Sequence, residues 1–398
     1  MCTKPHRKRG ARWGSSRRPY GSPGCAALTL GLESPTKRDV SMRPLSAFLG
    51  LLLVTACAWA QDLPKYPPPA EVKAAFLKML DRPKVAADPK VEETSRHASG
   101  WTLERLHIAS ENKADGRIER VPMLILRPEK SEKKLPAVIV LHGTGGSMQG
   151  MLGHLGELAN RNIIGIAVDA RYHGARGEKG SSAYVDAIAK AWTTTNDKTR
   201  EHPFYYDTCW DLWRVLDYLE TRPEIDSKRI GMVGISMGGI QTWLAAAVDE
   251  RVAVIAPSIA VQSFKWSLDN DQWNGRARTI AKAHELAAKD LGEPKVNRKV
   301  CRELWNKVIP GMLDQFDCPS MLRLFAGRPM IIVSGTKDGN CPIVGAKIAI
   351  ASAEKAYADA GQSERLKVSI AEVGHTITQE QWQETWAWFE RWLVEPKQ

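Results

Sequence analysis

The pattern of hydrophobic positions changes at Pro136, where short apolar runs begin to alternate with helix-length segments. Strands that are apolar on both faces are typical of a parallel sheet covered by helices on each side. The runs span residues 137–141, 163–168, 230–233, 252–256, 330–333 and 366–370. The sequence therefore predicts an α/β fold with a mostly parallel central sheet and helices on both faces.

The segments between and after these runs carry helical spacing at 207–220, 239–248, 344–360 and 379–394. In the last of them, aromatic and leucine residues recur every three or four positions, which indicates a core-facing stripe. Before Pro136, a helix is predicted over 70–80. Two alternating stretches, 101–110 and 117–127, predict a hairpin at a sheet edge.

One long segment interrupts the alternation. Residues 258–327 are largely helical in pattern and carry several tryptophans and lysines. An insertion of this length between sheet strands is typical of a cap over the edge where the loops gather. We therefore expect a catalytic domain over 100–398 with a cap at 258–327, preceded by a lead-in segment over 61–99.

The N-terminal region has the features of a targeting signal. Residues 42–60 combine a charged start, an apolar run too short to span a bilayer and an Ala58-Trp59-Ala60 end, as in a secretory signal peptide. Residues 1–41 are interpreted as an extension from an upstream start codon, or as a disordered basic arm. A competing pattern, Val54 to Cys57, resembles a bacterial lipobox. Export is expected in either case, with a membrane anchor only if Cys57 is lipidated.

Most of the net positive charge of the chain lies in this N-terminal leader, residues 1–60. The chain carries 56 basic and 45 acidic residues, giving a net charge of +11 over 398 residues. Ten basic and two acidic residues fall in the first 60, and the rest carries 46 and 43. A nucleic-acid binder needs its basic groups on a folded face, so no nucleic-acid partner is expected.

The cysteines do not predict a metal site. All seven lack a C-x-x-C pair or zinc-like spacing, so no structural metal is expected. Four of them follow the predicted signal peptide, in a compartment where disulfides form. The sequence leaves two alternatives: a Cys301–Cys318 disulfide, or four buried thiols.

The candidate nucleophile is Ser236, in the sequence Gly234-Ile235-Ser236-Met237-Gly238. A buried run precedes this segment and a helix follows it. A strand-to-helix turn this tight needs small flanking residues and lifts the serine above the sheet edge. The alternative is a serine that only caps the helix.

Serine needs a base, and the base needs an acid to orient it. In this architecture the chain order is serine, acid, histidine. His375 follows the last buried run, and the only other histidine after the serine, His284, lies in the insertion. Asp338 follows the fifth run, at the sheet edge where ligands gather, although Asp-Gly is also a common turn pair.

Acyl transfer also needs donors for a developing oxyanion. We expect the backbone N–H groups of Met237, at the start of a helix, and Thr144, in the loop His142-Gly143-Thr144-Gly145-Gly146. His142 is then a structural residue rather than a base. This chemistry needs no cofactor.

These motifs, in this order, resemble those of the α/β-hydrolase superfamily over about residues 103–393. The segment Asp169-Ala170-Arg171-Tyr172-His173-Gly174 resembles the D-x-R-x-x-G loop of its dienelactone hydrolase, acetyl xylan esterase and prolyl-oligopeptidase-like branch. Acetyl xylan esterases of the seventh carbohydrate-esterase family carry G-x-S-Q-G and His-Glu where this chain has Met237 and Thr376. Dienelactone hydrolases use cysteine in place of Ser236.

The resemblance implies an exported serine hydrolase of carboxylic esters, with a small-molecule or acylated carbohydrate ester as its substrate. One alternative is a peptidase like the prolyl oligopeptidases, which use the same catalytic residues but add a large propeller that is missing here. Another is a non-catalytic binding protein on the same scaffold. A serine-based lyase or acyltransferase is also open.

Overall fold

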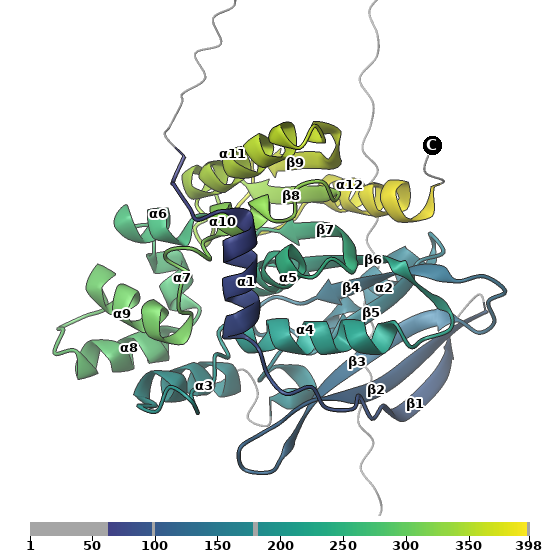
Figure 1. The fold of residues 1–398 in the computed structure, drawn as a ribbon, viewed down its shortest axis with the longest axis horizontal. Coiled ribbons are helices and arrows are strands. Elements are labelled where there is room, and N and C mark those ends of the chain that lie inside the picture. Colours follow the sequence, from purple (N-terminus) through teal and green to yellow (C-terminus); the bar gives the residue numbers. More distant parts are fainter. Residues whose placement is uncertain (1–62, 98–99, 178–181, 396–398) are drawn as a thin grey trace, which may run out of the picture. The chain divides into compact units, whose positions relative to one another are not determined.

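The computed structural model describes residues 63–97, 100–177 and 182–395, which build a nine-stranded sheet. From β4 to β9 neighbouring strands are parallel, whereas β1, β2 and β3 pair antiparallel and β3 joins the sheet antiparallel to β5. The strand order is β1-β2-β3-β5-β4-β6-β7-β8-β9 (Figure 1). The bounds are β1 (Lys90–His97), β2 (Trp101–Asn112), β3 (Ile118–Pro128), β4 (Leu135–Leu141), β5 (Ile164–Val168), β6 (Ile225–Ile235), β7 (Val252–Ser258), β8 (Met330–Gly335) and β9 (Leu366–Ala371). The predicted fold class is confirmed.

Helices cover both faces of the sheet, and each face has its own apolar core. Helices α2 (Leu152–Ala159) and α12 (Gln379–Phe389), with the π-helical turn η5 (Glu390–Val394), pack on one face. Helices α4 (Tyr206–Leu219), α5 (Met237–Val248) and α11 (Ile343–Asp359) pack on the other. The stripe on α12 is core, as predicted, although its first member, Trp382, is only partly buried and stacks on Trp386 at 5.0 Å.

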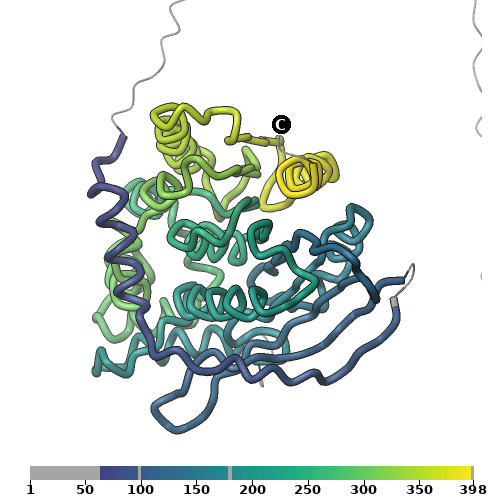
Figure 2. Tube along the Cα trace, turned by 45° about the vertical axis from the view of Figure 1, so that its right-hand side comes forward, coloured from purple at the N-terminus to yellow at the C-terminus, as the bar shows by residue number. Residues whose placement is uncertain are grey.

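The lead-in segment contributes two elements to the fold. Helix α1 (Pro69–Met79) buries Phe76, whose ring meets Tyr206 edge-on at 5.4 Å, and Figure 2 shows this purple helix beside segments far from it in sequence. Strand β1 pairs with β2, so the predicted hairpin is not the edge of the sheet. The lead-in segment therefore adds a strand to the sheet that the sequence did not predict. The sequence of β1, KVEETSRH, is polar and lacks the alternation that identifies a strand.

The insertion after β7 is helical. Helices α7 (Asn274–Arg278), α8 (Ala281–Asp290) and α9 (Arg298–Val308) lie together with α3 (Ser182–Thr193) at the left of Figure 1. Helix α6 (Phe264–Asp269) packs on α9, whereas α10 (Cys318–Arg323) packs on α5 and α11. The insertion has a buried interior of its own, where Trp305 donates to His284 at 3.0 Å.

The four cysteines in the described residues are free, buried thiols, so the Cys301–Cys318 bridge is not formed. In the same ranges, no helix is long and apolar enough to cross a membrane. The predicted signal peptide, the upstream extension and Cys57 all lie outside the described residues.

Candidate active site

Ser236 occupies the turn between β6 and α5. Its backbone has φ 53° and ψ −110°, and its N–H donates to Ser258 O at 2.9 Å. A positive φ is uncommon for a residue with a side chain. Strand β6 therefore ends and α5 begins within one residue, and this sharp turn presents Ser236 at the carboxyl end of the sheet.

The glycines on either side of Ser236 are required by close backbone contacts. A Cβ on Gly234 would lie 2.2 Å from the carbonyl group of Gly238. A Cβ on Gly238 would lie 2.6 Å from Leu141 O, at the end of β4. These contacts explain the G-x-S-x-G pattern, because any larger residue would push α5 away from the sheet.

The structure brings Ser236, His375 and Asp338 together. His375 Nε2 lies 2.7 Å from Ser236 Oγ, and His375 Nδ1 lies 2.7 Å from Asp338 Oδ2. The three residues come from the loops after β6, β8 and β9, which end at the same edge of the sheet. This is the hydrogen-bond order of a serine, a general base and an orienting acid.

The position of Asp338 is fixed by its own loop. Its Oδ1 accepts the N–H groups of Asn340 at 2.7 Å and Cys341 at 2.9 Å, leaving Oδ2 for His375. The side chain of Asp338 is 1% exposed, whereas that of His375 is 26% exposed. The acid is therefore enclosed, and the base is open to a substrate.

The two predicted oxyanion donors lie beside the serine. Met237 is the first residue of α5, where a backbone N–H has no acceptor within the helix. Thr144 lies in a turn next to Gly143, on which a Cβ would be 3.7 Å from Ser236 Cβ. Neither N–H donates to another residue in the described part of the chain. Both amides are thus available to a ligand atom.

His142 is buried beneath this loop. Its Nδ1 is 2.8 Å from Gly143 O, and its Nε2 accepts the N–H of Ala170 at 3.2 Å. Burial lowers the pKa of His142, so the ring is neutral at pH 7. The ring therefore holds the loop that carries Thr144 against the loop after β5. This is the structural role expected for His142.

The D-x-R-x-x-G motif fixes the position of the loop that follows β5. Asp169 accepts the N–H groups of Met148 at 2.7 Å and Ala175 at 2.8 Å. A Cβ on Gly174 would lie 2.2 Å from Asp169 Oδ1, so only glycine fits there. The first and last residues of the motif hold the loop after β5 against the segment that follows the oxyanion loop.

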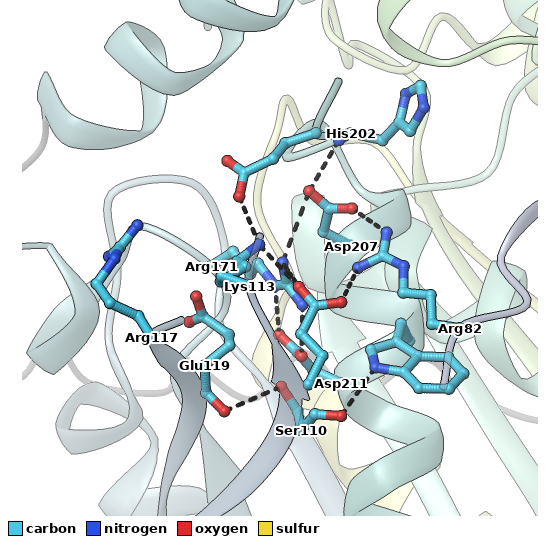
Figure 3. A network of polar contacts seen from close by, with 12 residues as sticks. Arg82, Ser110, Lys113, Arg117, Glu119, Arg171, His202, Asp207 and Asp211 are labelled. Atoms are coloured by element: carbon cyan, nitrogen blue, oxygen red, sulfur yellow. Dashed lines mark hydrogen bonds and ion pairs between the residues drawn. The ribbon is translucent and has the colours of Figure 1, made fainter. Parts of the chain in front are cut away.

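The arginine of this motif enters a buried charge network, drawn in Figure 3. Arg171 Nε and Nη2 each donate to Asp211 at 2.9 Å, and its Nη1 pairs with Glu111 at 2.8 Å. Burial raises the pKa of Asp207, but Arg82 and Arg171 outweigh burial and lower it to about 2. The network ties α4 to β2 and to the segment after α1.

A cavity of about 700 Å³ opens beside this network and is lined by Arg82, Lys113 and Arg200, among others. None of the Ser236, Asp338 or His375 side chains lines it. Its size alone does not make it the site of chemistry, because the candidate nucleophile and base are elsewhere.

Asp338, Cys341 and His375 are also the one group in the described residues whose ligand atoms are close enough to hold a metal ion. They do not fit a metal. Burial raises the pKa of Cys341 to about 12, which opposes the thiolate that a metal needs, and the Arg276 guanidinium lies 3.2 Å from its Sγ. The carboxylate oxygens are already engaged by His375 and two amides.

A family model described as acetyl xylan esterase (AXE1) matches residues 78–265. The solved acetyl xylan esterase from Paenibacillus sp. R4 superposes with a TM-score of 0.60, covering 83% of this chain and 97% of its own at 17% identity. The chain therefore has the α/β-hydrolase fold of these esterases. A glucuronoyl esterase from Solibacter usitatus shares the hydrolase fold, with a TM-score of 0.57 at 14% identity over 84% of this chain and 99% of its own. A Bacillus subtilis protein named "Putative hydrolase YtaP" is 23% identical over 285 residues, which are 69% of this chain and 84% of that protein.

Sequence reasoning missed several strained backbone positions. The described residues with a side chain and a positive φ include Tyr172 (61°), Tyr205 (79°), Ser236 (53°) and Ile259 (46°). Only Ser236 carries a motif that signals its conformation. Aromatic and β-branched residues disfavour positive φ, so nothing in the sequence indicates the other three.

Proposed function

We propose that this carboxylic ester hydrolase is an exported serine esterase that works through an acyl-enzyme. Ser236 Oγ attacks the ester carbonyl carbon while His375 Nε2 takes the hydroxyl proton. The N–H groups of Thr144 and Met237 stabilise the oxyanion. The intermediate expels the alcohol, which receives the proton from His375.

Water completes the reaction. His375 removes a proton from the water, which attacks the acyl-enzyme, and the second intermediate releases the acid and returns the proton to Ser236. Asp338 accepts the Nδ1–H of His375 throughout and stabilises the imidazolium. The observation that carries the proposal is the unbroken chain of two 2.7 Å contacts from Ser236 through His375 to Asp338.

The proposed substrate is an acylated carbohydrate or a related small ester. The matched proteins named for acetyl xylan and glucuronoyl esters support the carbohydrate class, and they show that one fold serves more than one ester. The predicted signal peptide at 42–60 supports export. Lipidation of Cys57 would anchor the exported enzyme at a membrane.

The test is hydrolysis of 4-nitrophenyl esters from acetate to hexanoate by the full chain and by Ser236→Ala. Turnover by the natural sequence and a loss of roughly 10³-fold or more in Ser236→Ala are expected, because the nucleophile is removed. Ser131→Ala, on an exposed loop, is the matched control and retains activity. Equal activity in Ser236→Ala would refute the mechanism.

A further inference from the structure

Arg276, on α7, is a buried cation without a carboxylate partner. The residue is 2% exposed, and its Nη2 donates to Asn340 O at 3.3 Å and Cys341 Sγ at 3.2 Å. Its guanidinium lies over the Phe264 ring, 5.5 Å from the centroid, and within the described residues its Nε makes no hydrogen bond. A guanidinium stays charged in a protein interior, so burial without a counter-ion is costly.

The other buried arginines in the described residues have carboxylate partners. Arg171 pairs with Asp211 and Glu111, and Arg214 contacts Asp217. Arg328, which is partly buried, donates instead to the backbone carbonyls of Ala246, Ala247, Asp249 and Val252. Arg276 has no comparable set of acceptors.

Two buried tyrosines beside Arg276 also have unused hydroxyls. Tyr184 is 2% exposed and Tyr205 is 1% exposed, and neither hydroxyl has a hydrogen-bond partner among the described residues. Burial raises the pKa of both phenols, and the Arg276 charge opposes that rise in each. Both hydroxyls are therefore neutral donors at pH 7, close to the same cation.

This cluster joins the two sides of the proposed active site. On one side, a Cβ on Gly275 would lie 2.0 Å from Gly339 O, so α7 packs directly on the loop that carries Asp338. On the other side, the Tyr184 ring lies 4.5 Å from His173, whose ring is 5.2 Å from His142 beneath the oxyanion loop. The elements that carry the cluster therefore contact both the Asp338 loop and the histidines beneath the oxyanion loop.

We propose that Arg276, with the hydroxyls of Tyr184 and Tyr205, binds a carboxylate of the substrate, so that the enzyme prefers esters that carry a second, free acid group. This rests on the proposed esterase function. A carboxylate would supply the counter-ion that Arg276 lacks and would accept hydrogen bonds from its free guanidinium and the phenols.

The test compares esters that differ only in this charge. One pair is 4-acetoxybenzoate and 4-acetoxybenzamide, with the acid on the alcohol side. The other is mono-4-nitrophenyl adipate and 4-nitrophenyl hexanoate, with the acid on the acyl side. In the full chain, kcat/KM for the charged member of at least one pair is expected to exceed that of the neutral member by roughly tenfold or more.

In Arg276→Gln, the ratio of charged to neutral kcat/KM is expected to fall by a similar factor, and Arg276→Lys to restore part of it. Arg278→Gln, an exposed position on the same helix, is the matched control and keeps the ratio. Should Arg276→Gln fail to fold, Tyr184→Phe and Tyr205→Phe preserve the rings and are expected to lower the ratio.

A lower rate for both members with an unchanged ratio would overturn the proposal, because Arg276 would then only position the Asp338 loop. A preference of the unmodified chain for the neutral ester in both pairs would overturn it as well. Neither result affects the esterase function, which fails only if the neutral esters are not hydrolysed and Ser236 is not acylated.

Discussion

The side chain of Ser236 is available because its backbone holds a conformation that most residues avoid. Residues held at such angles cost roughly 1–3 kcal/mol and persist where the surroundings fix them. Here the surroundings are the hydrogen bond from Ser236 to Ser258 and the close contacts of Gly234 and Gly238. The strain is therefore part of presenting the nucleophile to His375.

In the proposed mechanism Asp338 acts through His375, since one of its oxygens accepts from Nδ1 and the other from two backbone amides. In Asp338→Asn the amide would leave His375 without that acceptor or fix the wrong tautomer. We expect kcat for 4-nitrophenyl acetate to fall by roughly 10³- to 10⁴-fold, the range for such a change in a serine triad.

Asp115→Asn, in an exposed turn, is the control for this substitution. Thermal unfolding of both variants is expected to show that the fold is retained. A loss of kcat below about tenfold in Asp338→Asn would mean that Asp338 does not orient the base.

The residues of this site were predictable where a motif and a strand end coincide. Ser236 and Asp338 follow buried apolar strands, and His375 follows the edge strand β9, which is only partly buried, so their common edge could be predicted from the strand pattern. Arg276 could not be found in this way. Its significance depends on the partners it lacks, and no sequence pattern reports an absent partner.

At the scale of elements, the inner parallel strands were predictable because their apolar runs are continuous, whereas the edge strand β9 alternates polar and apolar residues and is only partly buried. Strand β1 was not, since it is a polar edge strand held by pairing with β2. Helix α2 was also missed. It contains Gly153 and Gly156 in eight residues, which lowers its intrinsic helix propensity.

The buried charge network joins α4 to its neighbours and makes a pH-dependent contribution to the stability of the fold. Asp207 has a folded pKa of about 2 against an ordinary value of 3.8. Its stabilising contribution, about 2 kcal/mol, is complete above the ordinary value and is lost as pH falls through 2. We expect the stability advantage of the natural sequence over Asp207→Asn to shrink from pH 5 to pH 2.

The measurement is the melting temperature of both proteins by circular dichroism across that range. Because Asp207→Asn leaves Arg82 and Arg171 with one carboxylate fewer, the variant melts lower at pH 5. A gap that stays constant down to pH 2 would show that Asp207 does not titrate with a lowered pKa.

At the scale of the whole molecule, the basic excess belongs to the leader rather than to the catalytic domain. Residues 61–398 carry 46 basic and 43 acidic side chains. If residues 42–60 are a signal peptide, the exported enzyme carries a net charge of +3 instead of +11.

The native N-terminus tests this proposal. Mass spectrometry of the protein purified from its producing cells is expected to find a chain that begins at Gln61, or at Cys57 with attached lipid. A native chain that still begins before Met42 would contradict both forms of export processing.

The central claim is that Ser236 forms a covalent intermediate. The most direct measurement is to treat the full chain with a serine-directed fluorophosphonate and to locate the adduct by intact mass and peptide mapping. The account predicts a single adduct on Ser236, with none in Ser236→Ala. An adduct on another residue, or no adduct in folded protein that hydrolyses esters, would contradict it.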